Sequence, residues 1–447
     1  MTRPVQTDSF RYMLSLVWPI FIELLLQMLV GNVDQMMVAR YSQDAVGAIA
    51  NANQVLNILL LVFSMMSMAT TILVAQSKGA QNHRQLEVIY TLSCVVNLFL
   101  SLLVSAAIFL FGDVFFRWMN VPAVFIEPAR EYMHIVGGFC FLQALFMTFS
   151  AIFRSNQMMR TGMLVSIVVN IANVLGNAVL IHGLGPIPAL GVKGAAIATN
   201  FSRLAGTAVL IFVFYHHLHG RIRLAHLRPF PTKLLMKLLA VGVPSGGESF
   251  SYSISQLVVM TFINSFGPDS VTAKAYCHMI SSFAVLYCLA VSQVTQVLVG
   301  HEVGARRFDA ADRITKRAAL SSTMITTVCS LIICTLIQPV LTLFGATPEV
   351  KALCQKVMYI EILLQFGRSF NMLYIRALQG AGDIRYPITI GILDNWITVV
   401  GLGFVLGRVL GLGLPGVWLA MALDENIRGL IFIFRWRSGK WKTKVLA

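Results

Sequence analysis

The chain repeats itself at an interval of 225 residues. A residue number in the first half plus 225 falls on a matching residue in the second half, over long stretches and without a gap. The matching pairs include Pro19 and Pro244, Glu23 and Glu248, Asp44 and Asp269, Gly79 and Gly304, Asn170 and Asn395, Gly191 and Gly416, and Arg203 and Arg428. Such a repeat predicts two similar structural units in tandem. In a membrane chain, it is typical of transporters whose site lies between the halves.

The composition predicts a membrane protein. Of the 447 residues, 57% are hydrophobic and only 12% are charged, whereas soluble domains carry about 25% charged residues. Twelve apolar runs are long enough to cross a bilayer: 13–38, 46–75, 87–111, 126–152, 162–182, 190–215, 234–263, 272–299, 314–337, 353–375, 387–408 and 414–434. Because backbone in hydrocarbon must satisfy its own hydrogen bonds, we predict twelve helices, six in each half.

The charge distribution predicts the orientation of these helices. The formal net charge is +15, which in a soluble chain would suggest nucleic-acid binding. Here most Lys and Arg residues lie near one set of helix ends, as expected for cytoplasmic loops. We therefore expect no nucleic-acid partner, a multi-pass protein of the plasma (bacterial inner) membrane, and both termini in the cytoplasm.

The fold class is predicted as an all-α membrane protein with two parallel six-helix repeats. The repeats are parallel because an even number of helices returns each half to its starting side. We expect an N-terminal bundle at 1–215, a cytoplasmic connector at 216–233 and a C-terminal bundle at 234–447. The seven cysteines lie in apolar runs and indicate small hydrophobic side chains rather than a disulfide or zinc framework.

Asp34 is the first candidate for a functional site. It lies in the run 13–38, about one turn inside the outer end, and an ionisable residue within a spanning segment is a functional-site hypothesis by default. The alternative is an interfacial carboxylate that pairs with Arg40 or meets solvent.

Glu23 and Glu248 are the next candidates. Each follows a proline by four residues, Pro19 in the first half and Pro244 in the second. Proline frees a backbone carbonyl and can kink a helix. A buried carboxylate at such a turn could bind a cation or a proton. The alternative is a structural glutamate that an arginine of a neighbouring helix holds.

Three asparagines share one face of the helix predicted at 162–182. Asn170, Asn173 and Asn177 have the spacing i, i+3, i+7, so this face should meet protein or a wet cavity rather than lipid. The alternative function is interhelical hydrogen bonding, worth about 0.6–2 kcal/mol per contact. Acids outnumber bases within the runs, which favours cationic cargo or coupling ions.

Motifs for catalysis and ATP use are missing from the sequence. We find no Gly-Lys-Ser/Thr phosphate loop, no nucleophile elbow and no metal-ligand spacing in the spans. The chain is therefore predicted to be a transporter and not an enzyme, without a cofactor, and driven by an ion gradient.

Five motifs in order give the chain a resemblance to the multidrug and toxic-compound extrusion (MATE) family. They are Pro19 followed by Val33-Asp34 and Met37-Val-Ala39; Gln76 with Gly79-Ala80; Asn173-Val-Leu-Gly-Asn177 running to Gly183; Gly191-Val-Lys-Gly-Ala-Ala-Ile-Ala-Thr199; and Arg376-Ala-Leu-Gln-Gly-Ala-Gly-Asp383 running to Pro387. The resemblance covers nearly the whole chain.

The resemblance implies two six-helix bundles that form a V and alternate between inward- and outward-facing states. It implies export of small amphipathic, often cationic compounds in exchange for H⁺ or Na⁺, by a protein that we expect to act as a monomer in the bilayer. The family's first-half cation site, carried over, consists of Asp34, Asn173, Asn177 and Thr199, with Na⁺ as one candidate ion at Asp34 and no resident metal. Many members have Asp at the position of Asn177.

The second half resembles the family less closely at its ion site. Tyr252 stands near the place of an acid that other members use, and Glu248 lies one turn earlier. We expect Glu248 to contribute to cation or proton coupling. The candidates for lining the transport cavity are Glu23, Gln54, Asn170, Tyr252, Gln256, Gln293, Glu361, Arg368 and Asn395.

A second function remains open, that of a flippase or exporter of lipid-linked or other amphipathic anions. It would need cationic side chains in the cavity, for which the candidates are Arg203, Arg368 and Arg428. The repeat itself favours coupling in the first half, because Asp34 corresponds to Val259 and Asn177 to Leu402.

Overall fold

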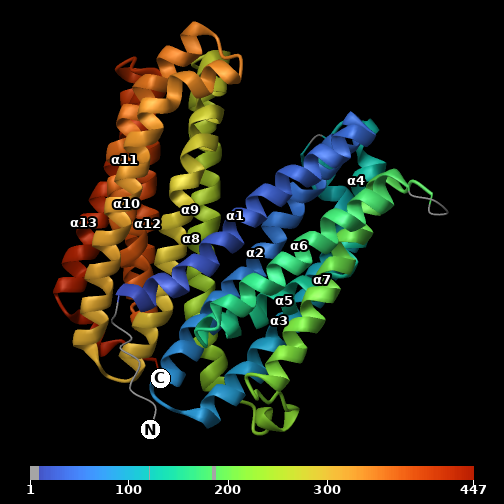
Figure 1. Cartoon of the computed structure of the whole chain (residues 1–447), viewed down its shortest axis with the longest axis vertical. Coiled ribbons are helices and arrows are strands. Elements are labelled where there is room, and N and C mark those ends of the chain that lie inside the picture. The colour runs from blue at the N-terminus through green and yellow to red at the C-terminus, as the bar shows by residue number, and fades with distance from the viewer. Residues whose placement is uncertain (1–9, 120, 184–187, 447) are drawn as a thin grey trace. The chain divides into compact units, whose positions relative to one another are not determined.

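The structure is a computed structural model that describes residues 10–119, 121–183 and 188–446 (Figure 1). Within these ranges, the regular elements are all helices. Those of the first half are α1 (Phe10–Tyr41), α2 (Gln43–Gly79), α3 (His83–Trp118), α4 (Ala123–Gly138), α5 (Cys140–Ser155), α6 (Met159–His182), α7 (Gly191–His216) and η1 (Leu224–Leu227). Those of the second half are α8 (Thr232–Asn264), α9 (Pro268–Gly304), α10 (Phe308–Leu343), α11 (Pro348–Ala381), α12 (Arg385–Asp394), η2 (Asn395–Leu402), η3 (Val405–Val409), α13 (Gly413–Arg437) and η4 (Lys440–Thr443).

The helix bounds confirm the predicted repeat. The bounds of α2 and α9 differ by 225 at both ends, as do those of α3 and α10. The turns match as well, since Gln81 and Arg306 both have positive φ, of 56° and 58°. A non-glycine residue with positive φ is uncommon, so its recurrence at this interval shows that the two halves share their backbone path in detail.

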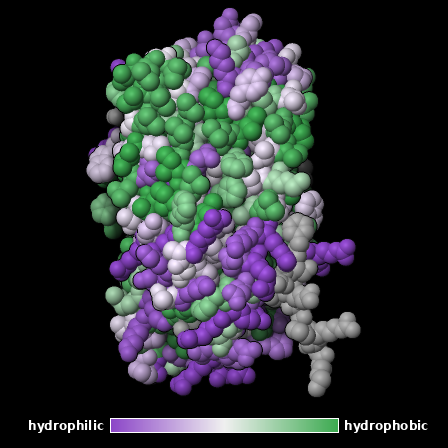
Figure 2. Space-filling model, turned by 90° about the vertical axis from the view of Figure 1, so that its left-hand side faces the viewer, coloured by the Kyte–Doolittle hydropathy of each residue, from purple (hydrophilic) through white to green (hydrophobic). Residues whose placement is uncertain are grey.

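The predicted all-α membrane fold is confirmed, since eleven of the twelve apolar runs lie within a helix or a broken helix, and the run 190–215 begins one residue before α7. Among the described residues, eight helices are long and apolar enough to span a membrane, and the bent pair α4–α5 makes a ninth. The other three long helices, α8, α11 and α13, carry charged or polar side chains within their runs. Figure 2 shows hydrophobic side chains over much of the upper half of one face, below a hydrophilic group at the top and above a larger hydrophilic area toward the end where α13 finishes.

The halves differ at two places in their backbone. The helix pair α4–α5 bends by 50° at Gly137-Gly138, whereas the corresponding Ile362-Leu363 lies within the continuous α11. The second difference follows Asp394, where η2 and η3 are π-helical while the matching stretch of α6 is α-helical. Glycine explains the bend, and π-helical turns often mark functional segments.

The chain forms two compact units. The N-terminal unit consists of Ile22–Val74 and Asn82–Gly242, and the C-terminal unit of the described residues in Met1–Phe21, Ala75–Gln81 and Val243–Ala447. Both α1 and α2 therefore contribute to both units, and the change within α1 falls two residues after Pro19.

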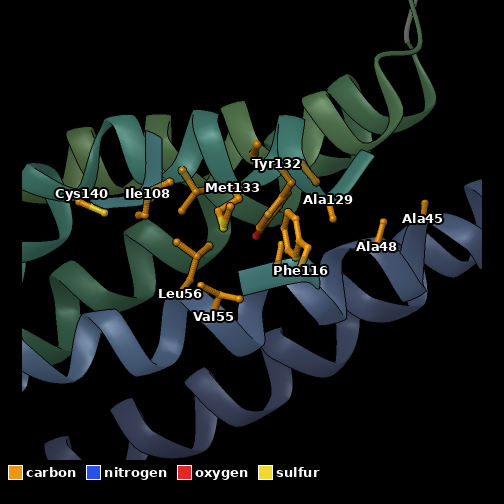
Figure 3. Close-up of a cluster of buried hydrophobic side chains, with 14 of the residues drawn as sticks. Ala45, Ala48, Val55, Leu56, Ile108, Phe116, Ala129, Tyr132, Met133 and Cys140 are labelled. Atoms are coloured by element: carbon orange, nitrogen blue, oxygen red, sulfur yellow. The ribbon is translucent and has the colours of Figure 1, made fainter. Parts of the chain in front are cut away.

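Each unit has its own apolar core. In the N-terminal unit, Val55 and Leu56 of α2 face Phe116 of α3 and the residues Tyr132 and Met133 of α4 (Figure 3). The core of the C-terminal unit joins α8, α9, α10, α11 and α13, together with Val399 of η2. With two separate cores, the polar groups of each unit can be organised independently.

A close crossing joins the ends of α2 and α9 within the C-terminal unit. A Cβ atom added at Gly79 would lie 2.0 Å from the His301 carbonyl oxygen, and one added at Gly304 would lie 2.0 Å from the Gln76 carbonyl oxygen. Both positions therefore require glycine. The Gln76 side chain is buried beside this crossing, where it donates to the Gly380 carbonyl at 2.8 Å and accepts from the Leu446 amide at 2.7 Å.

In the N-terminal unit, small residues bring α6 and α7 together. A Cβ atom added at Gly194 of α7 would lie 2.3 Å from the Leu180 carbonyl oxygen of α6, and one at Gly176 would lie 3.0 Å from the Ala198 Cβ. Small residues allow such close backbone approach between membrane helices.

Gly194→Ala should destabilise the N-terminal unit, because α6 and α7 must move apart to admit the methyl group. Overpacking of this kind costs about 1–3 kcal/mol. The control is Gly31→Ala in α1, where an added Cβ meets no atom of the described residues within 4 Å. The measurement is thermal unfolding in detergent, followed by a thiol-reactive dye that reports the buried cysteines. An equal unfolding midpoint for the two variants would contradict the packing argument.

Candidate ion-binding site

Three helices of the N-terminal unit bring the predicted site residues together. Asp34 lies on α1, Asn173 and Asn177 on α6, and Thr199 on α7. Asn173 and Asn177 are one helical turn apart and share a face, and the close packing of α6 on α7 places Thr199 beside them. The sequence therefore identified side chains that are neighbours in space, although it could not test their role.

The Asp34 carboxylate is held by side-chain amides. The Asn177 Nδ2 atom donates to Asp34 Oδ1 at 2.8 Å. The Asn173 amide lies 3.1 and 3.0 Å from Asp34 Oδ1 and Oδ2, and it donates to both when its NH₂ group faces the carboxylate. Amide orientations are assigned from such surroundings. The Asn173 amide also lies 3.5 Å from the Thr199 hydroxyl, which donates to the Ala195 carbonyl at 2.9 Å.

These contacts leave the charge of Asp34 uncompensated. The amides are dipoles without net charge, and Asp34 forms no ion pair among the described residues, so the pairing with Arg40 is not formed. A carboxylate in a partly buried site gains free energy by taking up a proton or a cation. Amide and hydroxyl oxygens beside a carboxylate are also ligands that suit hard cations such as Na⁺.

Two further residues near this site, Tyr132 and Asn53, were not identified from the sequence. The buried Tyr132 of α4 lies near Thr199 and near Asn53 of α2. The repeat offered a signal, because the residue that corresponds to Tyr132 is Val357. A polar side chain that replaces an apolar one at a buried, repeated position marks a local difference in function or packing.

Glu23 lies apart from Asp34 on α1. Eleven residues of helix separate them, or about 16 Å along the axis. Glu23 is buried, accepts from Gln27 at 3.5 Å, and lies 3.7 Å from the place of a Cβ atom at Gly162 of α6. Glu23 therefore faces protein within the N-terminal unit and is a buried polar residue separate from the Asp34 site.

The remaining candidates divide between the two units. In the N-terminal unit, Gln54 is exposed, and Asn170 has a buried Nδ2 atom without a hydrogen-bond partner among the described residues. In the C-terminal unit, Tyr252 is exposed, while Gln256 and Gln293 are partly buried.

Three candidates of the C-terminal unit are held by firm contacts. Glu361 accepts from Gln365 at 2.7 Å and from Trp418 at 2.6 Å. Asn395 donates to Ser255 at 2.6 Å. Arg368 pairs with Glu425 at 3.0 Å. Glu248 is partly buried on α8, and its Oε1 atom lies 3.2 Å from the place of a Cβ atom at Gly391.

Comparison with known proteins agrees with this architecture of a multi-pass membrane transporter. The MatE family model matches residues 19–179 and again 244–405, one match in each repeat. A Bacillus subtilis (strain 168) protein named "Uncharacterized transporter YisQ" is 34% identical over 98% of this chain and 97% of its own length. A Thermotoga maritima protein named "Probable multidrug resistance protein NorM" is 24% identical over 97% of this chain and 93% of its own.

A solved structure shows the same fold. The crystal structure of a MATE protein in the bent conformation superposes with a TM-score of 0.86 at 19% sequence identity, over 99% of this chain and 98% of that one. The chain therefore belongs to the MatE family of multidrug and toxic-compound transporters. It is a transporter and not an enzyme.

Asn177→Asp should turn this site into a stronger cation site. The variant places a second carboxylate beside Asp34. Two neighbouring carboxylates repel each other when both are ionised, so the pair binds a proton or a cation more strongly than one carboxylate does. We expect the thermal unfolding midpoint of the variant to rise with Na⁺ concentration more steeply than that of the unaltered protein, because a ligand of the native state stabilises it. Asn177→Ala is the control, since it removes the amide without adding charge. Equal Na⁺ responses in all three proteins would show that Asp34 and residue 177 do not share an ion.

Proposed function

We propose that the chain is a secondary antiporter that exports amphipathic, often cationic compounds in exchange for H⁺ or Na⁺ by alternating access. The observation that carries this proposal is the contact of Asp34 with Asn177 and Asn173. It joins an uncompensated carboxylate on α1 to neutral donors on α6. Relatives named as multidrug resistance proteins support drug-like cargo.

The coupling would act through the hydrogen bonds of Asp34. An ionised carboxylate accepts from both amides, whereas a protonated one offers a donor and holds them less strongly. A bound cation would instead draw amide oxygens toward the carboxylate. Either event changes the relative free energy of conformations in which α1 and α6 meet differently, and a ligand shifts an equilibrium only by such differential affinity. Substrate and ion then compete through shared conformations, with Glu248 as the contribution of the second half.

The charge pattern of the C-terminal unit favours cationic cargo over an anionic lipid. Two of the three arginines that a flippase would need are already paired within their unit, Arg368 with Glu425 and Arg428 with Asp424. A carboxylate pairs with each of these two arginines, and the Arg368–Glu425 pair joins α11 to α13. Arg203 lies near Tyr132 and Cys140 in the N-terminal unit.

We also propose the setting in which this exchange takes place. The basic loops support a plasma or bacterial inner membrane location with both termini in the cytoplasm. Residues 1–9, which begin the chain, lie outside the described residues. We propose that 1–215 and 234–447 act as the two bundles, joined by the connector 216–233, and that the working protein is a monomer.

Asp34→Asn should abolish gradient-driven export, because the amide cannot take up a proton or balance a cation. The measurement is dye efflux from vesicles that contain the purified variant. The matched control is Glu127→Gln, which neutralises an exposed acid of the same unit that pairs with Arg130. Export that survives Asp34→Asn at the unaltered rate would refute the assigned role.

Imposing the Na⁺ and H⁺ gradients separately should identify the coupling ion. We expect only one of them to accelerate efflux by the unaltered protein, and Asp34→Asn to remove that acceleration. Transport of a lipid-linked anion without any response to either gradient would favour the flippase instead.

A further inference from the structure

The C-terminal unit contains a cluster of buried charges that the Asp34 site does not use. We call it the α11–α13 cluster and define it as Arg368, Asp394, Asp424, Glu425 and Arg428. Arg368 Nε lies 3.0 Å from Glu425 Oε1. Arg428 contacts three carboxylates, since its Nη2 atom binds Asp424 Oδ2 and lies 3.8 Å from Glu425 Oε2, while its Nε atom lies 4.0 Å from Asp394 Oδ2.

The charges in this cluster do not balance. Three carboxylates share two guanidinium groups, and the side chains are 3–16% exposed. One negative charge is therefore in excess among these five residues. An excess charge inside a membrane protein is costly, and the uptake of one positive charge removes that cost.

The hydrogen bonds show where the excess lies. Both oxygens of Glu425 are engaged, one by Arg368 and the other by Asn371 at 2.6 Å, so this carboxylate is held in its ionised form. Asp424 Oδ1 and Asp394 Oδ2 are buried without a hydrogen-bond partner among the described residues, and so is the Arg428 Nε atom between them. Within the described ranges, the one other hydrogen bond to Asp394 comes from the Thr398 hydroxyl, at 2.9 Å.

The neighbouring elements present further titratable groups to the cluster. Glu248 of α8 and Arg428 both approach Gly391 of α12, since Glu248 Oε1 lies 3.2 Å and Arg428 Nη1 4.0 Å from the place of a Cβ atom there. Tyr252 of α8 interacts electrostatically with Arg368 and Arg428. From α11, Arg376 interacts with Glu248. Glu248 also interacts with Arg428, and Glu361 of α11 interacts with Arg368, so these acids do not remove the negative excess. Asp394 and Asp424 are the cluster acids with a buried oxygen that lacks a hydrogen-bond partner among the described residues.

The repeat supplies an independent reason to regard this cluster as a site. Asp424 corresponds to Thr199, which lies beside the Asn173 amide of the first half, and Arg428 corresponds to Arg203. The second half thus places an acid where the first half places a site hydroxyl. The backbone after Asp394 is π-helical, whereas its counterpart in α6 is α-helical, and π-helical turns are frequent at functional sites.

We propose that Asp394 and Asp424, on either side of Arg428, together bind one proton and form a second proton site. A proton needs only one oxygen, whereas a metal ion needs several converging ligands. No group of three or more His, Cys, Asp or Glu residues in the described part of the chain is arranged to hold a metal ion. The site exists independently of Asp34, and its use in transport rests on the proposed function.

Infrared spectroscopy tests the site without depending on export. A protonated carboxylic acid shows a C=O stretching band that an ionised carboxylate lacks. In the Asp34→Asn protein, where the first site is neutral, we expect such a band at neutral pH. Adding Asp424→Asn or Asp394→Asn should remove it, because each leaves two carboxylates against two guanidinium groups. The control is Asp269→Asn, which alters an exposed acid of the same unit and should leave the band unchanged.

Thermal unfolding supplies a second readout and checks that the variants fold. Asp424→Asn should keep the midpoint of the unaltered protein at neutral pH, since it removes the excess charge. Arg428→Gln should lower the midpoint. Without this arginine the native state must bind more protons than the unfolded chain does, so the loss of stability should grow as the pH rises. The absence of a band in Asp34→Asn, a band that survives both added substitutions, or a band that disappears when Na⁺ is added at constant pH would overturn the proposal.

Discussion

Polar side chains within the spanning helices must find their partners inside their own unit, and this constraint organises the rest of the structure. Lipid offers no hydrogen bonds, so each buried polar group depends on a neighbouring helix. Asp34 on α1 depends on α6, Glu361 on α11 depends on Trp418 of α13, and Asn395 depends on Ser255 of α8. These contacts fix which helix faces meet, and the apolar faces that remain turn to the bilayer.

The two repeats meet this constraint with different chemistry on one backbone plan. The first half combines one acid from α1 with amides and hydroxyls, so a single carboxylate carries the charge. The second half has Val259 in place of Asp34 and moves its acids to α12 and α13, where arginines accompany them. The charged groups of α11 and α13 pair within the unit, as Arg368 does with Glu425, which is why these two helices fall short of the apolar character of the other long helices.

Much of the fold could be predicted from the sequence, because the length of each hydrophobic run and the 225-residue repeat can both be read directly from the order of the residues. Helix spacing placed Asn173 and Asn177 on one face, and the family resemblance grouped them with Asp34 and Thr199. The α11–α13 cluster could not be predicted, because nothing in the order of Asp394, Asp424 and Arg428 shows that both carboxylates contact the Arg428 guanidinium group. Tyr132 was missed for the same reason, as its role depends on how α4 packs against α7. The runs also could not show that α1 and α2 each contribute to both compact units, since that depends on contacts between helices.

The glycine crossing of α2 and α9 follows the symmetry of the sequence repeat. Gly79 approaches the carbonyl of His301, and Gly304 approaches that of Gln76, so each contact is the image of the other under the shift of 225 residues. A six-helix protein with one such glycine would form the same contact twice when it paired with a second copy of itself. Each of the two segments therefore makes the same contact to the other, which is the self-complementary pattern of symmetric contacts. Neither glycine can be replaced without losing one of these two equivalent contacts.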